Sequence, residues 1–254
     1  MNALKYLVGC ILSAHMSVSF TSAGEPPTKF EPSTKTKLNF LFPSVSEIYT
    51  AAEARGLSFE NNTSSLDIKK PDWAALSDQQ KHLQLGSLIG YLAIASTANE
   101  TTQVAQCLDG ILQGLTSIGI PEASNSQQAI RDALGKIRAG AISRLKLYSL
   151  LDDLRREGLR DATANLNDTG VATILAGAWL RGGILLASQV DSDQEAAKLA
   201  EILARPELVD FIEILSSQPQ NRDLVTNLRD FVNKKENFTK EDIDKFADQA
   251  KGLI

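Results

Sequence analysis

The sequence is poor in the side chains that build most catalytic and metal centres. It contains only two cysteines and two histidines. One of each lies within the first 23 residues, a stretch that resembles a removable leader, so Cys107 and His82 are the ones expected in the exported protein. A disulfide within that chain is then excluded. A metal site with several histidines is excluded too, and a His-based catalytic triad has a single candidate.

The chain also lacks an excess of positive charge and the usual catalytic motifs. Its formal net charge is -5, and removing Lys5 with the leader makes it -6. This charge argues against a nucleic-acid partner and against electrostatic attachment to anionic lipid. Phosphate-binding glycine loops, G-x-S-x-G, H-E-x-x-H and C-x-x-C are all missing from the sequence. We therefore expect no cofactor and no metal.

Residues 1–23 have the layout of a secretory signal peptide. Lys5 precedes an apolar stretch over residues 6–20, and Thr-Ser-Ala at 21–23 supplies small residues for cleavage before Gly24. This layout predicts a periplasmic or secreted protein. Such export, with a single remaining cysteine, favours a bacterial envelope over an extracellular module held by disulfides.

A second interpretation of the leader is a lipoprotein signal. Leu-Val-Gly-Cys at 7–10 matches a lipobox, so a lipid anchor at Cys10 is the alternative to simple cleavage. The next segment, residues 24–37, is rich in Pro, Thr and Lys and has few apolar side chains. It cannot offset the entropy of ordering, and we expect a flexible leader there.

Hydrophobic periodicity predicts an all-α fold. Two segments, about 78–98 and 170–190, are apolar on nearly every face, which is typical of helices surrounded by other helices. Ser77 is predicted to cap the first, and Asp168 or Thr169 the second. Most flanking segments carry one apolar stripe at 3.6-residue spacing, and no strand-like alternation of useful length occurs.

The expected architecture is a multi-helix bundle over residues 38–190, with the helices at about 78–98 and 170–190 at its centre. From residue 191 the sequence becomes more charged and reads as a series of short amphipathic helices. Residues 191–254 are therefore predicted either to pack on this core or to form a small subdomain.

Small residues lie on one face of the predicted helix over residues 78–98. Gly86 and Gly90 are one turn apart, which allows a neighbouring backbone to approach closely.

The length of the segment 170–190 permits a membrane interpretation, since it is long enough to span a bilayer. Arg181 at its middle, however, costs about 2.5 to 3.5 kcal/mol on insertion scales. A central helix of a bundle explains the same residues without that cost.

Three stretches share a pattern with known proteins: Pro-Ser-x-x-Glu at 43–47, Leu-Gly-x-x-x-Gly at 85–90, and LAGAWLRG at 175–182. Together they resemble the signature elements of a family of uncharacterised secreted helical proteins of Gram-negative bacteria. The resemblance covers roughly residues 40–190 and implies a fold and an export route, but no activity. Tyr91 stands where the family tends to have an acid, and Arg181 where it has Glu. If those carboxylates act chemically in the family, this chain has lost them.

Arg181 and Trp179 are the candidate ligand-binding residues. A guanidinium among apolar neighbours needs a carboxylate, carbonyl groups, solvent or a ligand anion, because an unpaired buried charge is costly. Trp179 could stack on it. The alternative for each is a structural role. Cys107 on an apolar stripe is interpreted as a buried thiol, Trp73 as a plug over the core, and His82 as a surface or capping residue.

These observations favour a non-enzymatic protein of the envelope that binds a partner protein or a small apolar ligand. Two alternatives stay open. One is a hydrolase that uses carboxylates, which requires two acids about 5 to 10 Å apart in a cleft. The other is a membrane-associated helical protein, which requires the 170–190 helix to face outward.

Overall fold

The first of the two long apolar helices, α4 (Asp78–Thr97), begins at a reciprocal side-chain cap. Ser77 Oγ accepts a hydrogen bond from the Gln80 N–H at 3.4 Å, and Gln80 Oε1 accepts one from the Ser77 N–H at 3.0 Å. Each side chain thereby satisfies a backbone donor that the helix itself leaves free. This cap confirms the predicted start of the helix.

The second long apolar helix, α8 (Asp168–Ala187), is capped one residue earlier than the sequence suggested. Asn167 Oδ1 accepts a hydrogen bond from the Gly170 N–H at 2.7 Å. The prediction of Asp168 or Thr169 as the cap was wrong. Asn167 has extended backbone geometry and lies three residues before the donor, which is the spacing of an N-cap side chain.

The structure, a computed structural model, describes residues 45–57, 68–97, 100–141, 144–204, 222–234 and 236–254. These ranges contain helices and no strand, which confirms an all-α multi-helix bundle. The predicted signal peptide at 1–23, the leader at 24–37, Cys10 and residues 38–44 lie outside the described residues. Besides α4 and α8, the helices are α3 (Val45–Ala54), α5 (Thr101–Ser117), α6 (Asn125–Arg138), α7 (Arg144–Asn165), α9 (Asp193–Leu203), α11 (Arg222–Asn233) and α12 (Lys240–Lys251).

The contact between α4 and α8 is the most extensive helix pair in the described part of the chain. At Gly86 the backbones approach so closely that a Cβ atom would lie 1.9 Å from the Ile174 carbonyl oxygen. At Gly177 a Cβ atom would lie 2.3 Å from the Leu83 carbonyl oxygen. The prediction of a close backbone approach at Gly86 and Gly90 is confirmed, since Gly90 in turn faces Ala178 and Arg181.

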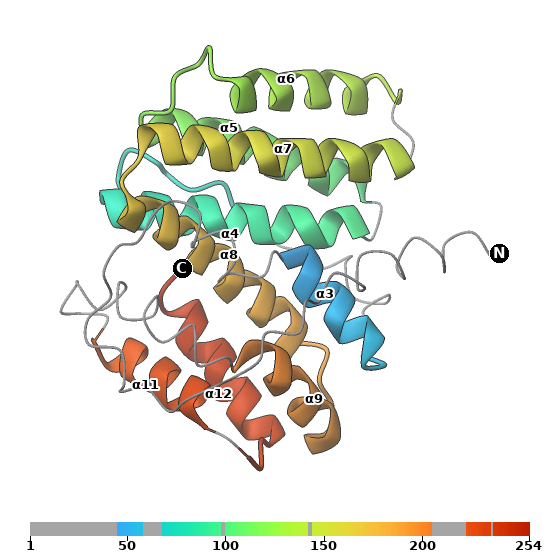
Figure 1. Ribbon diagram of the computed structural model, residues 1–254, viewed down its shortest axis with the longest axis vertical. Helices are drawn as coiled ribbons and strands as arrows, with labels where there is room; N and C mark the ends of the chain where they lie inside the picture. Colours follow the sequence, from blue (N-terminus) through green and yellow to red (C-terminus); the bar gives the residue numbers. More distant parts are fainter. Residues whose placement is uncertain (1–44, 58–67, 98–99, 142–143, 205–221, 235) are drawn as a thin grey trace, which may run out of the picture. The chain divides into compact units, whose positions relative to one another are not determined.

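The register of these contacts shows that α4 and α8 run in the same direction. His82, near the start of α4, lies beside Gly170 at the start of α8, whereas Gly90 lies beside Arg181, further along both helices. Two helices in the same direction need a long connection, and α5, α6 and α7 supply it. In that connection α5 packs on α4, α6 on α5, and α7 on α6 and α8 (Figure 1).

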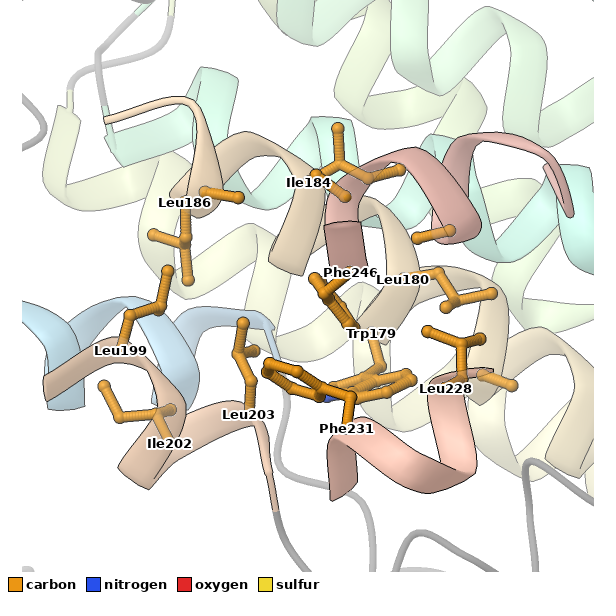
Figure 2. Close-up of a cluster of buried hydrophobic side chains, with 14 of the residues drawn as sticks. Trp179, Leu180, Ile184, Leu186, Leu199, Ile202, Leu203, Leu228, Phe231 and Phe246 are labelled. Carbon is orange, nitrogen blue, oxygen red and sulfur yellow. The ribbon is translucent and has the colours of Figure 1, made fainter. Parts of the chain in front are cut away.

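The buried apolar side chains form two clusters that meet at α4 and α8. One cluster lies between α4, α5 and α6 and includes Leu85, Leu108 and Leu134. The other surrounds α8 and is completed by α9, α11 and α12, with α12 making the larger contact with α8 (Figure 1). Figure 2 shows the second cluster, in which Trp179 and Phe246 are central.

The helix α8 also has the length and hydropathy of a membrane span. It is the only such helix among the described residues, and the candidate span covers Thr169–Ala187. The rest of the bundle buries 83% of the most apolar stretch of this span. The flanking helices cover the face that lipid contacts in a membrane span. The central placement of α4 and α8 that the sequence predicts is therefore confirmed.

Replacing Gly86 with Ala is expected to lower the free energy of unfolding by about 1 to 3 kcal/mol, because the new methyl group meets backbone that cannot rotate away. Gly135→Ala in α6 is the matched control, since a Cβ atom there has no neighbour within 4 Å. That change is expected to raise stability by about 0.5 to 1 kcal/mol. Urea unfolding followed by circular dichroism measures both. Equal stability of the Gly86 variant and the natural protein would contradict the close packing.

Candidate functional site

Arg181 is the only Lys or Arg in α8, and it lies where that helix meets α4. Gly90 makes room for it: a Cβ atom at Gly90 would lie 2.9 Å from Arg181 Cβ and 3.0 Å from Arg181 Cγ. The aliphatic stem of Arg181 therefore occupies the space that a side chain at position 90 would fill. The residue as a whole is half-buried.

Two side chains of α4 hold the guanidinium group. Arg181 Nε donates a hydrogen bond to Ser87 Oγ at 2.8 Å, and Ser87 itself is buried. The Tyr91 ring lies against the guanidinium, with Arg181 Cζ 4.4 Å from the ring centroid. Ser87 and Tyr91 are one helical turn apart on the same face of α4, so one surface provides both contacts. The guanidinium is thus held by the hydrogen bond at Nε and by the Tyr91 ring against one of its faces.

The charge of Arg181 has no carboxylate partner within the described ranges. No Asp or Glu there forms an ion pair with it, and its terminal nitrogens Nη1 and Nη2 have no hydrogen-bond acceptor among those residues. Burial lowers the pKa of the Arg181 guanidinium, while the neighbouring Tyr91 phenol acts in the opposite direction. Arginine stays protonated in proteins regardless. With respect to the described residues, the site is therefore a partly desolvated cation whose two terminal donor groups have no acceptor on their shared edge.

Trp179, the other predicted ligand-binding residue, lies elsewhere. Its side chain is 2% exposed and packs edge-to-face against Phe246, with ring centroids 5.4 Å apart (Figure 2). Residues two apart on a helix point about 200° away from each other, so Trp179 and Arg181 face different neighbours. The predicted stacking of Trp179 on Arg181 is wrong, since Tyr91 takes that place.

The other residues singled out in the sequence have structural surroundings. Cys107 is 0% exposed, which confirms a buried thiol, and burial raises its pKa to about 12. Trp73 covers α5, where a Cβ atom at Gly114 would lie 2.6 Å from its ring. In the part of the chain that the structure describes, no three His, Cys, Asp or Glu side chains are grouped to hold a metal ion.

His82 lies at a helix contact rather than on the open surface that its sequence position suggested. It is half-buried, and its Nε2 atom lies 3.2 Å from where a Cβ atom of Gly170 would stand. The Nε2 atom has no hydrogen-bond partner, whereas the imidazole ring makes a hydrogen bond to the backbone of Asp78. Burial lowers the pKa of His82, and this effect exceeds the opposite influence of Asp78.

The sequence pointed to Arg181 but not to Ser87 as its hydrogen-bond partner, and Tyr91 was noted only as a departure from a family pattern. The spacing of Ser87, Gly90 and Tyr91 is the sequence pattern that could have indicated these contacts, because a small residue between two polar ones leaves room for a side chain from another helix.

Comparison with protein-family models, with curated proteins and with solved structures finds no match to this chain.

The lowered pKa of His82 predicts a loss of stability in mild acid. The folded state binds the imidazole proton more weakly than the unfolded state, whose pKa is near the ordinary value of 6.5. The His82 contribution is therefore complete above that value and is lost as the pH falls through the lowered pKa. Urea unfolding between about pH 7.5 and 5.5 is expected to show a decline that is absent from His82→Gln. The same decline in both proteins would assign it to other groups.

Cys107 is expected to be unreactive in the folded protein, because its thiol is buried and almost entirely protonated at neutral pH. In a Cys10→Ser background, Ellman's reagent should label Cys107 only after denaturation. Gln113→Cys on the exposed face of the same helix is the matched control and should react at once. Rapid labelling of Cys107 in the native state would show that α5 opens.

Proposed function

We propose that the protein is an exported helical binding protein of the bacterial envelope, which holds an anionic group of its ligand at Arg181. Export is supported by the signal-peptide layout of residues 1–23, with the lipid anchor at Cys10 as the alternative. Binding is supported by one observation above all. A half-buried guanidinium is oriented by Ser87 and Tyr91 without a carboxylate partner among the described residues.

The energetics of this arrangement favour an external anion. The desolvation of Arg181 already occurs in the free protein, and the hydrogen bond to Ser87 limits the rotation of its side chain. A ligand that meets a preorganised group loses less free energy on binding than one that must order a flexible side chain. Hydrogen bonds between charged groups contribute about 1.5 to 3 kcal/mol, so one anionic group at this site accounts for at least a tenfold gain in affinity.

The same groups favour binding over catalysis. Arginine does not exchange its proton near neutral pH, so Arg181 serves as neither general acid nor general base. Ser87 Oγ accepts a hydrogen bond from the Arg181 cation. Within the described residues, no carboxylate or imidazole is paired with Arg181 at this site to act as a general base for the Ser87 hydroxyl. A nucleophile needs an adjacent base, and these contacts provide none.

An affinity capture tests the proposal. The natural protein, Arg181→Gln and the control Arg138→Gln are each incubated with extract of the native envelope, and retained small molecules and proteins are identified by mass spectrometry. Arg138 is also an arginine, but it is exposed and paired with Asp109 at 2.8 Å, away from the seam between α4 and α8. An anionic component should be retained by the natural protein and by Arg138→Gln, and reduced at least tenfold with Arg181→Gln.

The circular dichroism of all three proteins should agree, so that loss of capture reflects the site and not the fold. The protein recovered from a Gram-negative host should be exported and begin at Gly24, or at an acylated Cys10 in the alternative. Retention that is equal in the natural protein and Arg181→Gln would refute the binding role of Arg181. An uncleaved protein confined to the cytoplasm would refute export.

A further inference from the structure

The number of positive charges at the Arg181 site limits which anions it can accept. Arg181 is the only Lys or Arg of α8, and the only one of α4 is Lys81 in its first turn. Lys81 lies nine residues before Gly90, which corresponds to about 14 Å along a helix. Lys81 is also paired with Asp78 at 3.5 Å. These two helices thus bring one uncompensated positive charge to the site.

The donor geometry is equally restrictive. Nε is used by Ser87, which leaves the edge formed by Nη1 and Nη2, and one face of the group is covered by Tyr91. Two parallel N–H donors on one edge match the two oxygens of a carboxylate. A phosphate carries more charge and more acceptors than this edge satisfies, and phosphate sites usually add backbone N–H groups or further cations.

Two partly exposed apolar side chains flank Arg181 along the helices. Leu185 lies one turn beyond Arg181 on the same face of α8 and is partly exposed. Helical side chains lean toward the start of their helix, so we expect Leu185 to lean toward Arg181. Tyr91, also partly exposed, provides an aromatic ring on the α4 side. Arg181 thus has the Tyr91 ring against it from α4 and an apolar residue one turn further along α8.

We propose that the anion bound at Arg181 is the carboxylate of a small monocarboxylic acid whose body is apolar. The carboxylate oxygens accept hydrogen bonds from Nη1 and Nη2, and the apolar body lies over Leu185 and Tyr91. This inference rests on the proposed binding function and specifies its ligand. A ligand of this class matches the single charge, the two donors and the apolar flanks together.

Sodium octanoate is the probe, because it joins one carboxylate to an aliphatic chain. Its binding to the full-length purified protein is measured by isothermal titration calorimetry and by the carbonyl shift of octanoate labelled with carbon-13. Octanol retains the chain without the charge, and inorganic phosphate provides an anion without the chain. Octanoate is expected to bind, with octanol and phosphate each at least tenfold weaker.

Substitutions then assign the binding to the site. Arg181→Gln is expected to weaken octanoate binding at least tenfold, and Arg181→Lys should recover only part of it, because an ammonium group lacks the planar pair of donors. Tyr91→Leu removes the ring beneath the guanidinium and should weaken binding severalfold. Arg138→Gln is the matched control and should bind octanoate as the natural protein does.

Three results would overturn the carboxylate assignment: octanoate that does not bind, phosphate that binds as tightly as octanoate, or octanoate binding that Arg181→Gln leaves unchanged. The envelope capture separates this failure from failure of the proposed function. If a different anionic component is retained through Arg181 while octanoate does not bind, the binding function stands and the ligand class is wrong. If neither shows dependence on Arg181, both proposals fail.

Discussion

The close approach of the α4 and α8 backbones determines where the rest of the described chain can lie. Gly86 and Gly177 each leave no room for a side chain, because the opposing carbonyl oxygens of Ile174 and Leu83 occupy that volume. At such short separation the two helices make the most extensive helix contact in the described part of the chain, and both apolar clusters include residues of each helix. The other helices then complete a core whose centre is set by main-chain contact rather than by large side chains.

The same contact brings a charged group into a position that apolar packing alone would not favour. Gly90 admits the stem of Arg181 between the helices, and Ser87 and Tyr91 then hold its guanidinium. One helix thus contributes the charge and the other contributes its orientation. A cation placed in this way loses part of its hydration in the free protein, which is a stability cost that the proposed anion would offset.

The sequence predicted those features that depend on one helix at a time. Residues 78–98 and 170–190 are apolar all round, so their central position follows from composition, and the buried state of Cys107 follows from its stripe. The partners of Arg181 could not be predicted. Which residue of α4 faces it depends on the direction and register of the helix pair, and a single sequence contains no direct measure of either. The cap at Asn167 was missed because three adjacent polar residues are all acceptable N-caps.

The parallel arrangement of α4 and α8 affects how the chain acquires its structure during synthesis. Ser87 and Arg181 are 94 residues apart, so the glycine face of α4 has no partner until α5, α6, α7 and α8 have all been made. The contacts among α4, α5 and α6 are local and can form as each helix emerges. The second cluster has no such early nucleus. A nascent chain that pauses before α8 is synthesised therefore exposes the glycine face of α4, where chaperones and other nascent chains can bind.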